Sequence, residues 1–263
     1  GALTLSGLMD AASNGGASAL TIGNSTGGTG LITLSGTLGG TRAISSLTVT
    51  DDLALAASVT TTGAQLFEDV VSVDTALALS TTDGDVEFKG TLDSEANENN
   101  SLTINAGSCA VTFYGVVGGA TNGQLGDLFV NSTGKTWFKA AVTSASVTTN
   151  TGGTVQVDGG SVNTSGKQTY GEAMTLGADT TFTVTDLDAK AINNAGFKLT
   201  VNESGNNGVI AQVVSGGGNF LKQGAGTLTM LGASTFSGGT TVEGGVLKLG
   251  ISNVVDGTGA ITS

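Results

Sequence analysis

Residues 216–231 read GGGNFLKQGAGTLTML, and residues 232–250 continue GASTFSGGTTVEGGVLKLG. The apolar residues of this stretch fall into four short runs, at 220–221, 228–231, 241–242 and 246–249. Within the runs apolar residues alternate with Thr or Lys, which is the period of a β-strand with one buried face. The glycine-rich segments between the runs lack the Asn-Gly or Asp-Gly pair of a tight hairpin. They predict corners at which glycine adopts positive φ.

The same stretch resembles the autotransporter-associated β-strand repeat of bacterial surface proteins, which reads roughly GxGTLTLxGxxTYSGGTTVxxGxLxLG. Met230 and Phe236 stand where that repeat usually has Leu and Tyr. The resemblance covers residues 216–250 and implies an all-β chain folded as a right-handed parallel β-helix. It also implies an exported passenger of a type V secretion system, located outside the cell or at the bacterial surface in association with the outer membrane.

The composition of the chain agrees with stacked strands. Glycine accounts for 44 of 263 residues, proline is absent, and charged residues make up 11%, less than half of the usual ~25%. Each proline would remove a donor from a strand ladder. Low charge and high glycine are also compatible with disorder, but Val, Ile, Leu and Phe recur at strand spacing, which favours a folded all-β chain.

The net charge of −12 excludes the basic surface of a nucleic-acid-binding protein. No basic-then-apolar signal segment and no apolar run of ~18 residues occurs in the sequence. The chain begins at Gly1 within a strand-like phrase, so we expect residues 1–263 to be a single β-helix fragment of a longer passenger. The translocator in the outer membrane would then lie outside this chain, and we expect a monomer.

Two internal repeats support a solenoid. The phrase SVTTTGAQLF, which starts at Ser58, matches SVNTSGKQTY, which starts at Ser161. This phrase resembles the recurring units of filamentous-haemagglutinin-like adhesins. A shorter word, Leu-Thr followed by Ile, Val or Met, or the variant Leu-Phe-Val, starts at Leu20, Leu47, Leu102, Leu128, Leu199 and Leu228. Several gaps between these words are near one or two multiples of a common period, which predicts roughly ten to thirteen coils.

Close carboxylate pairs are the first candidates for chemistry. They occur at Asp51-Asp52, Asp83/Asp85 and Asp186/Asp188. Residues i and i+2 of a strand share a face, so Asp186 and Asp188 would be placed to hold a cation or to act as acid and base. Calcium requires six to eight oxygen ligands, which two carboxylates do not supply. We therefore expect no metal and no cofactor, and interpret these pairs as surface charge.

Three nucleophile or phosphate motifs are incomplete. Ser25 lies in a Gly-x-Ser-x-Gly sequence, but the chain has no histidine to serve as its base. Gly134-Lys135-Thr136 resembles the end of a P-loop, yet Phe129 occupies the position of the first glycine. Cys109 also lacks a neighbouring base and is predicted to be a small buried side chain beside a strand. These observations predict no catalytic residue.

Two polar segments and one aromatic pair are candidates for contacts. Residues 93–100, which read DSEANENN, predict a projecting polar loop, either an interaction site or simply solvated. Residues 186–194 predict either a strand with a loop or a single helical turn. Alternation places one of Trp137 and Phe138 outward, where it would stack on a sugar unless it packs in the core or under a loop. No binding residue is assigned.

The sequence thus predicts a non-catalytic extracellular rod of a large adhesin or autotransporter passenger. Its loops would contact host cells, neighbouring cells or matrix glycans in adhesion or biofilm formation, and by resemblance its C-terminal coils would aid export and folding. The alternative is a carbohydrate-active β-helix enzyme, a polysaccharide lyase or hydrolase, for which Asp51-Asp52 is the nearest candidate. The His-Gly and Arg-Ile-Lys elements of the polygalacturonase-like enzymes are missing, and Arg42 is the only arginine.

Overall fold

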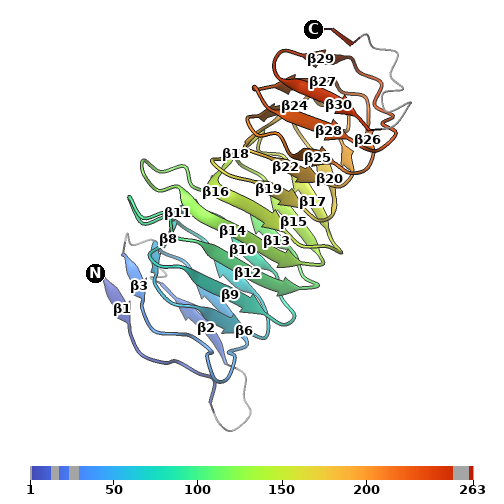
Figure 1. Cartoon of the computed structure of the whole chain (residues 1–263). Helices are drawn as coiled ribbons and strands as arrows, with labels where there is room; N and C mark the ends of the chain where they lie inside the picture. Colours follow the sequence, from blue (N-terminus) through green and yellow to red (C-terminus); the bar gives the residue numbers. More distant parts are fainter. Residues whose placement is uncertain (1, 13–17, 24–29, 251–260, 263) are drawn as a thin grey trace. The chain divides into compact units, whose positions relative to one another are not determined.

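The computed structural model describes residues 2–12, 18–23, 30–250 and 261–262 (Figure 1). Every regular element over these residues is a β-strand, and the strands fall into two compact units, residues 1–136 and 137–263. Within each unit, strands from successive turns of the chain pair in parallel. The strands form a β-solenoid of about 11 turns. The predicted all-β parallel β-helix is confirmed, whereas a single β-helix over residues 1–263 stays a prediction.

Three parallel sheet rows make up the first unit, each listed here in pairing order. The first row contains β1 (Leu3–Leu5), β3 (Ile32–Leu34), β5 (Leu53–Leu55), β8 (Val71–Val73) and β11 (Leu92–Ser94). The second contains β2 (Ala19–Ile22), β4 (Ser46–Val49), β7 (Gln65–Phe67), β10 (Val86–Phe88) and β13 (Val111–Phe113). The third contains β6 (Val59–Thr61), β9 (Leu77–Thr81), β12 (Leu102–Gly107) and β14 (Leu125–Ser132).

The second unit also has three rows, and two of them start from one long strand, β16 (Val142–Thr149). From its first half follow β18 (Ser161–Thr164), β21 (Thr180–Val184), β24 (Leu199–Glu203), β27 (Phe220–Gln223), β29 (Thr240–Val242) and β31 (Ile261–Thr262). From its second half follow β19 (Gln168–Tyr170), β22 (Leu187–Ala189), β25 (Gly208–Ile210), β28 (Thr227–Met230) and β30 (Val246–Leu249). The remaining row contains β17 (Thr154–Val157), β20 (Ala173–Leu176), β23 (Ile192–Asn193) and β26 (Val214–Ser215). The strand β15 (Lys135–Phe138) contains the division between the units.

The length of one turn varies more than the word spacing predicted. Leu20 pairs with Leu47, the start of the next word, as predicted, whereas Leu47 pairs with Gln65 after a much shorter stretch of chain. Leu199 and Leu228 lie in β24 and β28, which belong to different rows, so their spacing is not a turn. The turns therefore differ in length, because corners of different length separate strands of similar length.

Alternation of inward and outward side chains builds the core as predicted. In the first unit, Phe67, Phe88 and Phe113 occupy equivalent positions of paired strands and are fully buried. Their rings stack with centroids 5.0 and 5.4 Å apart and interplanar angles of 11° and 0°. In the second unit, Tyr170 and Phe182 meet edge to face, with centroids 5.7 Å apart. Parallel register thus places like side chains on one another.

Glycines within residues 216–250 serve two purposes. Gly224 and Gly245 have φ of 75° and 68°, the left-handed conformation that the corners were predicted to require. Gly238 serves close approach instead, because a Cβ there would lie 2.3 Å from the carbonyl oxygen of Gly218 in the preceding turn. Positive φ is therefore only part of the reason that this stretch is rich in glycine.

The two long sequence repeats form the same corner, one in each unit. Gln65 begins β7 after β6, and Gln168 begins β19 after β18. Both glutamines are fully buried, and each Nε2 donates to a threonine hydroxyl four residues earlier, Thr61 or Thr164, at 3.1 or 3.2 Å. Each also donates to a carbonyl oxygen 15 residues later. The glutamine therefore ties two turns together from inside the solenoid.

Candidate functional site

The pair Asp186/Asp188 does not converge on a shared ligand position. Asp186 Oδ1 accepts a hydrogen bond from the Asn207 amide at 2.8 Å, whereas Asp188 Oδ2 pairs with Lys167 Nζ at 3.1 Å. Residues 187–189 form β22 and residues 192–193 form β23, so this segment is a strand with a loop, and the helical turn is not formed. In the described part of the chain, no group of three or more His, Cys, Asp or Glu side chains is placed to hold a metal ion.

The two residues of the pair Asp51-Asp52, which directly precedes β5, differ in burial. Asp51 is buried, with 8% of its surface exposed, while Asp52 is half-buried. Arg42, the single arginine, donates from Nε to the carbonyl oxygen of Ala11 at 2.8 Å. The Thr41 and Arg42 amides donate to Asp10, and chiefly the Thr41 hydrogen bond lowers the pKa of Asp10. These contacts give the arginine a structural position between turns.

The pair Asp83/Asp85 lies beside Cys109. Asp85 Oδ1 accepts from the Ala110 amide at 2.8 Å, and Cys109 Sγ lies 3.7 Å from Asp83 Oδ1. Cys109 is half-buried between β12 and β13, so the prediction of a buried side chain was wrong. Burial and the Asp83 charge raise the pKa of the Cys109 thiol, which opposes formation of the nucleophilic thiolate.

The polar segment 93–100 is only partly a projecting loop. Asp93 and Ser94 belong to β11 and are buried, because Asp93 Oδ1 accepts from the Ala120 amide and Ser94 Oγ accepts from the Asn100 amide. Residues 95–99 are exposed. Asn97 adopts φ of 71°, and its amide donates to the Asn122 carbonyl oxygen at 2.8 Å. The exposed tip is thus short and fastened to the following turn.

Trp137 and Phe138 alternate as predicted. Phe138 is fully buried, whereas Trp137 is half-buried and its Nε1 donates to Asp158 Oδ2 at 2.7 Å. Lys139 Nζ lies 3.8 Å from the centre of the Trp137 ring and covers one face of it. Thr136 is fully buried in β15, which is incompatible with a phosphate-binding loop at residues 134–136. Ser25 lies outside the described residues.

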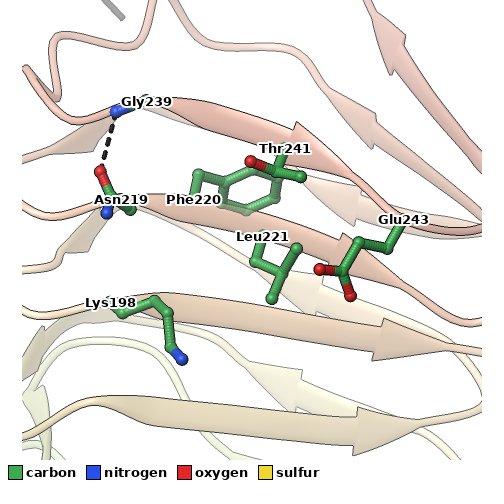
Figure 2. Close-up of a pocket in the computed structure, with 7 residues that line it drawn as sticks. All are labelled: Lys198, Asn219, Phe220, Leu221, Gly239, Thr241 and Glu243. Carbon is green, nitrogen blue, oxygen red and sulfur yellow. Dashed lines mark hydrogen bonds between the residues drawn. The ribbon is translucent and has the colours of Figure 1, made fainter. Parts of the chain in front are cut away.

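A shallow groove crosses the outer face of the second unit (Figure 2). It has a volume of about 350 Å³ and is lined by Lys198, Asn219, Phe220, Leu221, Gly239, Thr241 and Glu243. Leu221 of β27 supplies the apolar floor, with the Glu243 side chain beside it and Lys198 on the preceding turn (Figure 2). Asn219 Oδ1 accepts from the Gly239 amide at 2.9 Å, and Glu243 Oε2 accepts from Gln223 Nε2 at 2.7 Å.

The sequence alone does not reveal this groove, because its residues come from three turns of the chain. Lys198, Leu221 and Thr241 are about one turn apart in sequence, and only the register of β24, β27 and β29 brings them together. The groove offers a cation, an amide and an aliphatic surface, which suits weak contact with a polar ligand.

Three ionisable side chains that the sequence analysis also missed lie inside the second unit. Glu203 and Lys222 are fully buried, and Glu172 is 5% exposed. Burial raises the pKa of each glutamate from 4.5 to about 7, and Lys222 partly offsets this rise at Glu203. Burial also lowers the pKa of Lys222. Strand alternation could have predicted the burial of Glu203, because in β24 it follows the inward-facing Leu199 and Val201 at intervals of two residues.

Lys222 is held by the backbone of two turns. Its Nζ donates to the carbonyl oxygens of Gln223, Gly224 and Gly244, the last two at 3.2 and 3.4 Å. An ammonium group has three donors, so these carbonyls account for all of them. The lysine therefore closes the corner after β27 from the inside.

The fold and these contacts define a repeat protein, a parallel β-solenoid whose successive turns are fastened by buried polar side chains. Residues 220–249, which form β27 to β30, match the family described as passenger-associated-transport-repeat. Together the repeat and the solenoid fit an autotransporter-passenger-like repeat protein. The resemblance found in residues 216–250 is confirmed.

The repeat implies a surface-exposed or secreted protein and suggests a structural, non-catalytic role. No curated protein and no solved structure matches the chain. Across the described residues, no helix has the length and apolarity needed to cross a membrane.

Proposed function

We propose that this chain is a non-catalytic, surface-displayed segment of an autotransporter passenger that contacts host cells, neighbouring cells or matrix glycans. The observation that carries the proposal is the match of residues 220–249 to a passenger-associated repeat, within a parallel solenoid. A solenoid repeats similar outward faces at each turn, so many weak contacts add up when many copies are displayed. The translocator that anchors such a passenger would be outside residues 1–263.

Two features of the surface support contact with a polar partner. The groove around Leu221 combines the Lys198 ammonium group with an aliphatic floor. The tip at residues 95–99 is exposed but fixed by a hydrogen bond from the Asn97 amide to the next turn, which reduces the entropy lost on binding. The net charge of −12 opposes nucleic acid as the partner.

The adhesive role is tested with beads that carry many copies of the 263-residue chain. We expect such beads to be retained on cell layers or on glycan-coated surfaces, whereas the free chain competes only weakly. A gain of about 100-fold or more over the free chain is expected for a multivalent interaction. Retention no better than that of beads carrying heat-denatured chain would contradict the proposal.

The groove is tested by the double substitution Lys198→Gln/Leu221→Ser. We expect it to reduce bead retention several-fold, because it removes the cation and the apolar floor together. The matched control Lys190→Gln/Leu66→Ser changes a half-buried lysine and an outward-facing strand leucine elsewhere, and should leave retention unchanged. Equal loss in both variants would exclude the groove as the contact surface.

We further propose that the C-terminal turns, residues 216–250, aid export and folding. The test joins the chain to an autotransporter translocator in a bacterial host and measures its surface exposure by protease access. Gly238→Ala should lower surface exposure, because its Cβ would collide with the preceding turn, 2.3 Å from Gly218 O. Gly217→Ala is the matched control, since the nearest atom to its Cβ would be 3.7 Å away. Equal exposure of both variants and the wild type would contradict the role.

Polysaccharide lyase or hydrolase activity of this chain would directly contradict the proposal that it is non-catalytic. The wild-type chain and the Asp51→Ala/Asp186→Ala variant should both show no turnover on a panel of polysaccharides. Turnover by the wild type that the double substitution abolishes would establish the enzyme instead.

A further inference from the structure

The described part of the second unit encloses two carboxyl groups that have no hydrogen-bond partner. Neither oxygen of Glu172 and neither oxygen of Glu203 is hydrogen-bonded within the described residues. An ionised carboxylate without donors is costly to bury, whereas a neutral carboxyl group costs much less. Both side chains are nevertheless placed inward by the strands around them, Glu203 at the end of β24 and Glu172 just before β20.

The surroundings of Glu203 leave space for the carboxyl group but do not fully compensate the negative charge of its ionised form. Gly208 begins β25 opposite, and a Cβ at this position would lie 1.9 Å from Glu203 Oε1, so the absent side chain makes room for the carboxyl group. Lys222 of β27 attracts a negative charge there, and Asp186, before β22, repels it. The Gly208 amide also favours the ionised form, although it lies outside hydrogen-bond geometry with either carboxyl oxygen. The hydrogen bonds of the Lys222 ammonium group go to backbone carbonyls instead of to Glu203.

The surroundings of Glu172 are simpler. The Thr149 hydroxyl, at the end of β16, faces this carboxyl group, yet it is also without a hydrogen-bond partner among the described residues. Burial dominates here, since Thr149 offsets it only in part. Both glutamates are thus held where the protonated form is favoured.

We propose that Glu172 and Glu203 make the second unit a proton-dependent module, which is tightest when both carboxyl groups are neutral and loosens when they lose their protons. This inference does not depend on the adhesive role. In the first unit the interior contains the stack of Phe67, Phe88 and Phe113. The first unit also buries the carboxyl groups of Asp51 and Asp93, but these have partners, such as the Ala120 amide that donates to Asp93 Oδ1. The response is therefore expected in residues 137–250.

The direction with pH follows from proton binding in the two states. In the folded state each glutamate has a pKa of about 7, against 4.5 when unperturbed. Between these values the folded chain retains protons that the unfolded chain has released, so stability increases as pH falls from 7 toward 4.5 and decreases as pH rises through 7. From pH 8 to pH 5.5 the folding equilibrium constant should rise by about tenfold or more per carboxyl group.

The test is urea unfolding of the full chain at pH 8 and pH 5.5. Trp137, the single tryptophan, reports on the second unit, and hydrogen exchange of peptides covering residues 170–176 and 199–210 localises the change. The double substitution Glu172→Gln/Glu203→Gln should remove the excess pH dependence. The control Glu95→Gln/Glu243→Gln changes two exposed glutamates and should retain it. An equal pH dependence in both variants, or wild-type stability that rises with pH, would overturn the proposal.

A second measurement does not require that the variant folds. The infrared spectrum of the wild-type chain should contain the band of a protonated carboxyl group at pH 6, and this band should disappear by pH 8.5. Exposed carboxyl groups are ionised at both pH values, so the band reports on Glu172 and Glu203. Absence of the band at pH 6 in the folded chain would also overturn the proposal.

Discussion

The two units use one backbone design with different interiors. In the first unit, equivalent positions of β7, β10 and β13 hold three phenylalanine rings stacked face to face. In the second unit, inward positions at the ends of β24 and β27 hold Glu203 and Lys222. Parallel stacking thus fixes which residues meet, whereas the sequence of each turn determines whether they are apolar or ionisable. Stability should therefore depend on different interactions in the two units.

The largest difference is expected from the aromatic positions. Phe88→Ala should lower the free energy of unfolding of the first unit by about 3–5 kcal/mol, because it opens a cavity between two stacked rings. Phe182→Ala is the matched change in the second unit, where the ring has one edge contact with Tyr170. We expect a smaller loss there, measured by urea unfolding with hydrogen exchange to separate the units. A larger loss for Phe182→Ala would show that the stacked rings do not stabilise the first unit more than the Tyr170–Phe182 contact stabilises the second.

The next effect concerns the buried lysine. Lys222→Met keeps an unbranched apolar side chain but leaves the carbonyl oxygens of Gln223, Gly224 and Gly244 without their shared donor. We expect the second unit to lose about 1–3 kcal/mol. Lys248→Met, an exposed lysine of β30, should change stability by less than about 0.5 kcal/mol. Equal values for the two variants would show that Lys222 does not fasten the corner.

The smallest effect compares the repeated corner in its two copies. Gln168 Nε2 has three acceptors, and its Oε1 accepts from the Tyr170 hydroxyl at 3.1 Å, whereas Gln65 Oε1 has no partner among the described residues. The NH2 group of either glutamine has two hydrogens to donate, so the two side chains differ chiefly at Oε1. Gln168→Leu should therefore cost about 1 kcal/mol more than Gln65→Leu, because only Gln168 loses a hydrogen bond at its amide oxygen. Equal costs in thermal or urea unfolding would indicate that these corners are held by packing alone.

The fold was predictable because its signal is local and repeated. Alternation within β27, β28 and β30, together with the glycine corners, identified the strands of residues 216–250 directly. The repeated phrases at Ser58 and Ser161 form the same corner in the structure, and each copy contains a buried glutamine, Gln65 or Gln168. The turn length was not predictable from word spacing, because the steps from Leu20 to Leu47 and from Leu47 to Gln65 are both single turns, although the second is much shorter.

The site was much less predictable than the fold. The carboxylate pairs were interpreted as surface charge, which is correct for Asp188 but wrong for Asp51, which is buried. Glu203 was not singled out, although the alternation of inward and outward residues in β24 places it inward. The groove requires the register of three turns, and single-sequence patterns do not specify register between distant strands. The loop at residues 93–100 was predicted from its polarity, yet the hydrogen bond that helps to bury Asp93 comes from Ala120, in a later turn of the chain.

Disulfide formation between engineered cysteines tests whether successive turns stack in parallel register. In a Cys109→Ser background, the pairs Thr181→Cys/Thr200→Cys and Thr183→Cys/Asn202→Cys occupy directly paired positions of β21 and β24. Adjacent strands are ~4.8 Å apart, within the range that a disulfide spans. Both pairs should form an intramolecular disulfide, whereas the crossed pairs 181/202 and 183/200 should not. Disulfides in the crossed pairs and none in the direct pairs would show antiparallel strands and contradict the account.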